Sequence, residues 1–190
     1  LFSLIYSFPA AFGYPAAKLF TLGICLLTAY QTCRLAEDLR LERPAFVIPL
    51  LFLQPSFALI SADTMTEPLF GLLFVVALRL HHARRVALGA LVASLMILAR
   101  PEGFFLAALW GVWILRDDGR WQVWRNLPRL SLLATGAILW WAAAYLLTGD
   151  PLYIKHNWPA GWEVTSAVNG IGNLWVYGKL LPEIVGPLLS

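Results

Sequence analysis

The sequence predicts an all-α protein, a polytopic transmembrane helical bundle of about six or seven spans, and two features of its composition lead to that prediction. Of its 190 residues, 59% are hydrophobic and only 13% are charged, whereas soluble domains carry about 25% charged residues. The charged residues are also gathered in short breaks between long apolar runs. Because Leu1 and the last ten residues both lie in apolar runs, the sequence is expected to be a fragment of one transmembrane domain, 1–190.

The apolar runs are the expected membrane-spanning segments, and charged residues, proline or glycine bound each of them. They are residues 14–33, 44–60, 68–80, 86–99, 104–115 and 130–147, with partial apolar ends at 1–12 and 184–190. The runs at 86–99 and 104–115 are shorter than the about 20 residues that cross a bilayer. Either polar residues extend them, or the turn between them lies below the membrane surface in a protein-lined depression.

Prolines divide these segments further. Pro9 is expected to break the first run, and Gly13 and Pro15 to form a turn before the second. Pro49 and Pro55 lie inside the 44–60 run, so this span is expected to be kinked.

The placement of basic residues predicts an orientation. If the spans alternate, the breaks at 34–43, 79–85 and 116–129 share one side, and all the other breaks share the opposite side. The first side then carries ten of the 14 basic residues. These are Arg34, Arg40, Arg43, Arg79, Arg84, Arg85, Arg116, Arg120, Arg125 and Arg129. By the positive-inside rule this side is cytoplasmic, which accounts for the net charge of +3 without a nucleic-acid partner.

Histidines and cysteines are given structural interpretations. His81 and His82 lie among the basic residues and are expected in a solvated loop of the cytoplasmic side. Cys25 and Cys33 are expected to be packed thiols, because their spacing fits neither a metal site nor a disulfide framework.

Four ionisable residues lie in two breaks of the extracytoplasmic side, 61–68 and 100–103: Asp63, Glu67, Arg100 and Glu102. Asp63 and Glu67 are four residues apart, so a helical turn through them would place both carboxylates on one face. A charge at membrane depth is costly and is therefore a candidate for function. We expect the functional site among these residues, where substrate must come from the membrane because cytosolic nucleotide-sugars and ATP do not reach this side.

Each of the four also has a structural interpretation. Arg100 suits a phosphate group, but it could equally form an ion pair with a neighbouring carboxylate. Glu67 could orient an acceptor hydroxyl or hold Arg100, whereas Thr64–Glu67 also matches a helix capping box. Asp63 could be a second acid, a metal ligand or a helix cap. Glu102 is expected in the first turn of the next helix, as a supporting residue.

A second group follows the break at residue 148. Lys155 and His156 could attract a lipid phosphate, and Trp158 and Trp162 could stack on a sugar or lie in the aromatic belt at the membrane interface. No cofactor motif is evident, since the sequence has no glycine-rich phosphate loop, zinc-ligand spacing or Ser-His-Asp arrangement. A divalent metal remains open.

The motifs at 61–68 (SADTMTEP) and 100–103 (RPEG), in this order and spacing, resemble the GT-C glycosyltransferases. The nearest members are the bacterial and archaeal relatives of protein O-mannosyltransferases and of the lipid A aminoarabinose transferase. The resemblance covers residues 1 to about 165. It implies a multi-pass enzyme of the plasma or inner membrane, which transfers a sugar from a polyprenyl-phosphate donor to an acceptor glycan, lipid or protein on the extracytoplasmic face.

The resemblance also implies roles for individual residues. The main catalytic base is expected in a loop before Leu1, with Asp63 and Glu67 as supporting catalytic residues. Arg100, with Lys155 or His156, would steady the departing polyprenyl phosphate. Two other classes stay open: a transporter or flippase, in which charged residues and broken helices also mark a substrate path, and a non-catalytic lipid-binding subunit.

Overall fold

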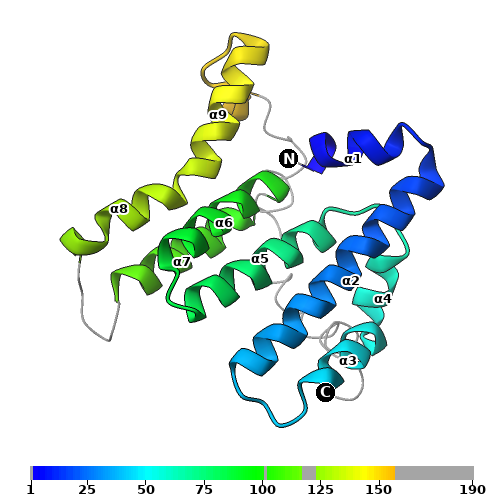
Figure 1. The fold of residues 1–190 in the computed structure, drawn as a ribbon. Coiled ribbons are helices and arrows are strands. Elements are labelled where there is room, and N and C mark those ends of the chain that lie inside the picture. Colours follow the sequence, from blue (N-terminus) through cyan, green and yellow to red (C-terminus); the bar gives the residue numbers. More distant parts are fainter. Residues whose placement is uncertain (1, 101, 117–122, 157–190) are drawn as a thin grey trace, which may run out of the picture.

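A computed structural model describes residues 2–100, 102–116 and 123–156, which form helices joined by short turns (Figure 1). The helices are α1 (Phe2–Ala10), α2 (Tyr14–Asp38), the 3-10 helix η1 (Pro44–Phe46), α3 (Val47–Leu53), α4 (Pro55–Ser61), α5 (Glu67–His82), α6 (Val86–Ala99), α7 (Gly103–Leu115), α8 (Val123–Leu133), α9 (Thr135–Thr148) and α10 (Tyr153–His156). The described residues contain no strand, which confirms the all-α prediction for this part of the chain. The partial span at 184–190 lies outside the described residues.

Two segments are long and apolar enough to cross a membrane: α2, with 25 residues, and 123–148, which joins α8 and α9 over 26 residues. A third would be 44–61, but its two halves are bent by 78°. The helices α6 and α7 are apolar but have only 14 and 13 residues, fewer than the about 20 that span the hydrocarbon layer. These features indicate a membrane protein, while the predicted six or seven spans are not confirmed.

The prolines act in part as expected. The bend lies at Gln54, whose extended backbone (φ −71°, ψ 120°) is the conformation favoured before a proline, here Pro55. Pro49 lies inside α3 without breaking it. Pro9 lies inside α1, which ends one residue later, so the predicted break at Pro9 is wrong. The predicted turn before α2 is confirmed, because Gly13 has φ 97° and Pro15 lies in the first turn of α2.

Long-range contacts show how the helices are arranged. The Tyr14 hydroxyl, at the start of α2, donates to Asp63 just before α5 at 3.0 Å. At the other ends of the same two helices, Arg79 and Asp38 are 3.0 Å apart. The helices α2 and α5 therefore lie side by side in the same direction, and α6 and α7 follow as antiparallel hairpins (Figure 1).

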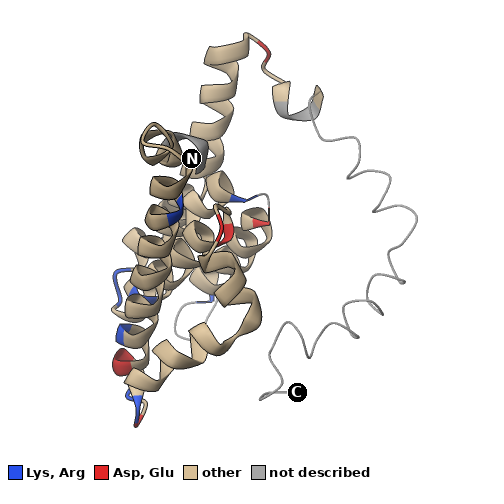
Figure 2. Ribbon diagram, turned by 90° about the vertical axis from the view of Figure 1, so that its right-hand side faces the viewer, with Lys and Arg blue, Asp and Glu red and all other residues tan. Residues whose placement is uncertain are grey.

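This arrangement gives the bundle two ends. We call the C-terminal ends of α2, α5 and α7 and the start of α8 the basic end, because seven of its residues between 34 and 116 are arginines. We call the start of α2, the loop 62–66, Glu67, Arg100 and Glu102 the acidic end. In Figure 2 most of the blue lies towards the lower left of the ribbon, while red segments gather with blue near mid-height.

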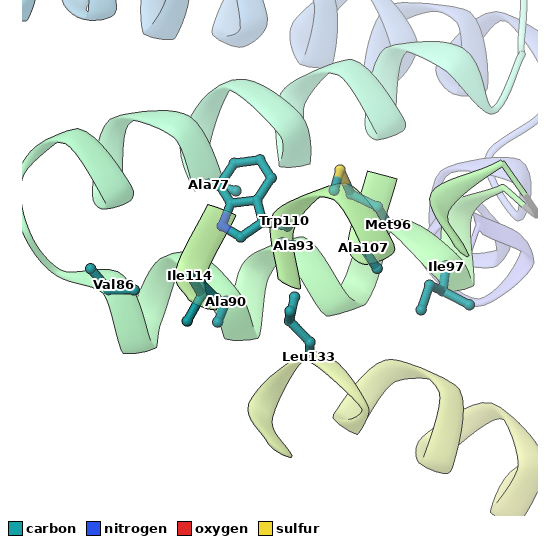
Figure 3. Close-up of a cluster of buried hydrophobic side chains, with 10 residues drawn as sticks. All are labelled: Ala77, Val86, Ala90, Ala93, Met96, Ile97, Ala107, Trp110, Ile114 and Leu133. Atoms are coloured by element: carbon teal, nitrogen blue, oxygen red, sulfur yellow. The ribbon is translucent and has the colours of Figure 1, made fainter. Parts of the chain in front are cut away.

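Small residues let the central helices approach closely. Ala77 of α5 and Ala90 and Ala93 of α6 are fully buried and belong to the main core cluster with Trp110. Figure 3 shows Trp110 of α7 lying against Ala77, and Leu133 of α8 pointing toward α6. A Cβ on Gly136 of α9 would lie only 1.9 Å from the Ser94 carbonyl oxygen, so α9 crosses α6 at backbone contact. Close packing through small residues is typical of helices that associate within a membrane.

The helices at the basic end are longer than predicted. α2 continues to Asp38, and Arg34 pairs there with Glu37 at 2.6 Å. α8 begins at Val123, inside the segment expected to be a loop. Its Asn126 is fully buried and donates to the Ile114 carbonyl oxygen at 2.8 Å, which satisfies the C-terminal end of α7.

The histidines are not in a solvated loop. His81 and His82 form the last turn of α5, and the half-buried His81 ring stacks on Trp113 with centroids 3.8 Å apart. The loop prediction is wrong because the flat imidazole packs well against the tryptophans of α7. Cys25 is buried and Cys33 partly buried, both as free thiols, which confirms their prediction.

Candidate functional site

The acidic end is formed by two helix boundaries. α5 begins at Glu67, with Pro68 in its first turn, a position where proline's missing N–H has no intrahelical partner to lose. α6 ends at Ala99 because Arg100, the residue before a proline in the sequence, adopts extended backbone (φ −150°, ψ 144°). These two boundaries bring Arg100 next to Glu67 although 33 residues separate them.

The Arg100 cluster consists of Arg100, Glu67 and Glu102. Arg100 binds Glu102 with two parallel hydrogen bonds, from Nε at 3.1 Å and from Nη2 at 2.9 Å. Its Nη1 donates to Glu67 Oε1. This bidentate geometry is the strong form of an arginine–carboxylate pair. The cluster has one positive and two negative formal charges.

The electrostatics keep this pair charged. The hydrogen bonds from Arg100 lower the pKa of the Glu102 carboxyl, and partial burial opposes them. In return, the hydrogen bonds to Glu102, aided by the charge of Glu67, raise the pKa of Arg100. The side chain of Arg100 is 28% exposed and therefore reaches solvent. Of the two interpretations of Arg100, the structure shows the ion pair, and the phosphate interpretation remains a prediction.

Glu67 does not form the predicted capping box. The residue before α5 is Thr66, and no side chain caps the helix there. Instead Glu67 accepts hydrogen bonds from Arg100 and, at 3.4 Å, from the Thr66 hydroxyl. The capping pattern requires the Glu to stand three residues into the helix, and here it is the first helical residue. Glu102 directly precedes α7 rather than lying in its first turn, and its side chain does not cap that helix either.

Asp63 lies apart from Glu67. It is in the loop between α4 and α5, so the predicted helical turn that would place both carboxylates on one face is not formed. Its Oδ1 accepts hydrogen bonds from the Thr64 backbone N–H at 2.7 Å and from the Tyr14 hydroxyl at 3.0 Å. The Thr64 N–H, followed by the Tyr14 hydroxyl, lowers the pKa of Asp63. Its Oδ2 has no hydrogen-bond partner among the described residues.

Tyr14 and Lys18 are site residues that the sequence analysis missed. Lys18 Nζ lies 4.8 Å from the centre of the Tyr14 ring, a cation–π distance, and its charge contributes to the lowered pKa of Asp63. A signal was available: alternation of the helices places residue 14 at the same end as 61–68, and residues four apart share a helix face.

The second predicted group follows α9, and His156 pairs there with another residue. Lys155 and His156 lie in α10, and His156 Nδ1 is 2.8 Å from Asp150 Oδ2. The hydrogen bond from His156 lowers the pKa of Asp150. No hydrogen bond or ion pair joins His156 to the Arg100 cluster within the described residues. The predicted Trp158 and Trp162 lie outside the described part of the chain.

The acidic end presents several polar side chains to a ligand. Within residues 2–100, 102–116 and 123–156, no three His, Cys, Asp or Glu side chains are grouped to hold a metal ion. The acidic end instead offers ionised carboxylates, an arginine, a lysine and a tyrosine hydroxyl.

Comparison of the chain with protein-family models, curated proteins and solved structures gives no significant match. The resemblance to GT-C glycosyltransferases therefore rests on the sequence motifs at 61–68 and 100–103 and stays a prediction.

Proposed function

We propose that this protein is an integral-membrane glycosyltransferase that moves a hexosyl or pentosyl group from a polyprenyl-phosphate donor to an acceptor on the extracytoplasmic face. One observation carries the proposal: Glu67, Arg100 and Glu102, from the two motifs that resemble the GT-C enzymes, form a single charged cluster. The excess of arginine at the opposite end supports an extracytoplasmic position for this cluster.

In the transfer, a base removes the proton of the acceptor hydroxyl as the acceptor oxygen bonds to the sugar's C1. The C1–O bond to the phosphate breaks, and the lipid phosphate leaves with the electron pair. Negative charge grows on the leaving group, and a pre-placed cation stabilises it. Arg100 uses three of its five N–H donors on Glu102 and Glu67. Its two remaining N–H donors are assigned to the leaving phosphate.

Asp63 and Glu67 have supporting roles in this mechanism. The unbonded Oδ2 of Asp63 accepts a hydrogen bond from a sugar or acceptor hydroxyl, with Oδ1 held by Tyr14 and Thr64. Glu67 fixes the direction of Arg100. Lys155 and His156 contribute charge toward the lipid phosphate only if α10 lies near the donor when it is bound.

The test is consumption of a labelled polyprenyl-phosphate sugar by membranes that contain the natural protein, a readout that does not depend on knowing the acceptor. Arg100→Ala should reduce consumption by about 100-fold or more, as expected for loss of a transition-state hydrogen-bond donor. Asp63→Asn should reduce it by about tenfold, since it removes charge but keeps shape. Both variants should still be recovered from the membrane fraction.

Arg34→Ala is the matched control, because it removes an arginine–glutamate pair at the opposite end of the bundle. It should leave consumption unchanged. Full activity in Arg100→Ala would contradict the proposed role of the cluster.

A transporter or flippase is the second candidate, and the 78° break between α3 and α4 favours it. Broken helices next to charged residues often mark a substrate path across a membrane. Movement of the intact lipid-linked sugar across vesicle membranes, without cleavage of its phosphate bond, would support this candidate over the transferase.

A further inference from the structure

A groove between α2 and α5 at the basic end is separate from the site described above. It has a volume of about 480 Å³, within the range of ordinary ligand pockets. Its polar lining includes Gln31, Asp38, Arg79 and Arg85, and its apolar lining includes Val76 and Leu80. We propose that this groove binds the phosphate headgroup of an anionic phospholipid.

Arg79 is the anchor of the groove. Its Nε donates to Asp38 Oδ2 at 3.0 Å, and its Nη1 donates to Gln31 Oε1. Of the five N–H donors of a guanidinium, three therefore have no acceptor among the described residues. Its side chain is 26% exposed, so it is held in place and still open to a ligand. A guanidinium fixed in this way loses little entropy when it binds phosphate.

Arg85 adds a second cation. It is exposed, and its side chain has no hydrogen bond or ion pair with any described residue. It is placed at the groove by the end of α5, where Arg84 turns with φ 60° and the Arg85 N–H bonds to the Leu80 carbonyl oxygen at 2.9 Å. That bond also satisfies a carbonyl that would otherwise repel an anion.

The surrounding charge is favourable. Segments 34–43 and 79–85 carry six arginines and three carboxylates, an excess of three positive charges. The C-terminal ends of α2 and α5 contribute partial negative charge through their dipoles, and the arginines outweigh it.

The apolar lining favours a lipid over free phosphate. Val76 and Leu80 provide a surface for the glycerol backbone and the upper acyl chain. The groove also lies against the end of α2, one of the two segments long enough to span a membrane. The end of a membrane-spanning helix is where lipid headgroups are found. Basic pockets between helices near the membrane surface are known to bind anionic headgroups.

The experiment uses the natural protein purified in non-ionic detergent, and native mass spectrometry counts bound phosphatidylglycerol and phosphatidylcholine with identical acyl chains. Phosphatidylglycerol should fill one saturable site, while phosphatidylcholine should bind weakly. Arg79→Gln should weaken phosphatidylglycerol binding by about tenfold and Arg85→Gln by about fivefold. Arg125→Gln, which removes an exposed arginine from α8 outside the groove, is the matched control and should bind like the wild type.

Asp38→Asn is a second test, and its outcome does not depend on whether Arg79→Gln folds. Removing this carboxylate from the groove should strengthen phosphatidylglycerol binding by about fivefold, a gain that misfolding does not produce. Equal binding of both lipids, unchanged binding in Arg79→Gln and Arg85→Gln, or full displacement by millimolar inorganic phosphate would each overturn the proposal. The result does not depend on the glycosyltransferase proposal, because sugar transfer is not measured.

Discussion

Each end of the bundle holds an arginine that is hydrogen-bonded between helices. The two arginines differ in the charge of their partners and in the number of N–H donors that have no partner. At the acidic end, Arg100 faces two glutamates and uses three N–H donors on them. At the basic end, Arg79 faces one aspartate and one amide, and three of its donors have no acceptor among the described residues. Arg100 therefore keeps two N–H donors beside two carboxylates, whereas Arg79 keeps three beside a single carboxylate.

The partners of an arginine therefore influence what else it can bind. A guanidinium bonded to two carboxylates sits in a cluster of net negative charge, which attracts a free anion only weakly. Its two remaining N–H donors therefore suit a phosphate that a bound donor substrate brings to them. A guanidinium bonded to one carboxylate and a neutral amide, with other arginines nearby, keeps its attraction for phosphate. Three substitutions can test the helix packing between the two ends and then each end in turn.

The largest expected effect comes from disrupting the close packing of α9 against α6. Gly136→Ala would place a Cβ 1.9 Å from the Ser94 carbonyl oxygen, so α6 and α9 must move apart. Overpacking of this kind costs about 1–3 kcal/mol, and backbone has little room to adjust. We expect a thermal unfolding midpoint in detergent several degrees lower, or no folded protein. The control Gly23→Ala has no neighbour within 4 Å of the new Cβ and should be neutral or stabilising; equal behaviour of the two variants would refute the close crossing.

An intermediate effect is expected from acid at the Arg100 cluster. The pKa of Glu102 is lowered in the folded protein, so its ion pair stabilises the fold above the unfolded value of about 4.3. That contribution is lost as pH falls below this value and through the folded pKa. Wild type should therefore lose more stability than Glu102→Gln between about pH 6 and pH 3, measured by thermal unfolding. In an Arg100→Gln background, the substitution Glu102→Gln should no longer alter the pH dependence; if it still does, Arg100 is not the cause.

The smallest expected effect is a gain in stability at the basic end. Arg40 has φ 58°, a left-handed conformation at the end of α2 that favours glycine. Arg40→Gly should raise the free energy of unfolding by about 0.5–1 kcal/mol, because relief of strain exceeds the added entropy of the unfolded chain. Arg43→Gly is the matched control: Arg43 has φ −135°, so glycine should be neutral or destabilising there. A loss of stability in Arg40→Gly would show that the arginine charge outweighs the strain.

Much of the secondary structure was predictable because it depends on local pattern. Apolar runs, prolines before helices and charged breaks placed α2, α5, α6 and α7 nearly where they lie. The errors occur where packing overrides local composition: the charged segment 116–129 was expected to be a loop, yet Asn126 lies in a helix and is buried against the end of α7. His81 is helical and stacked for the same reason.

The sequence predicts which charged residues belong to the candidate site, but it does not predict their contacts. The motifs at 61–68 and 100–103 pointed to Asp63, Glu67, Arg100 and Glu102, since isolated charges in apolar surroundings need a partner. Tyr14 was missed because its partner Asp63 is 49 residues away. Alternation of the helices places both at the same end, but only the folded structure shows that the two side chains meet.

Hydrophobicity, proline and charge act residue by residue along the chain. They are enough to predict a helical protein with the character of a membrane protein and with arginine concentrated in three separate breaks. Which polar side chains meet depends on the packing of the helices: Arg100 meets Glu67, Tyr14 meets Asp63, and Arg79 meets Asp38 across 41 residues. Helix packing through small residues sets the distances between helix ends, and a hydrogen bond forms only where those distances are short enough.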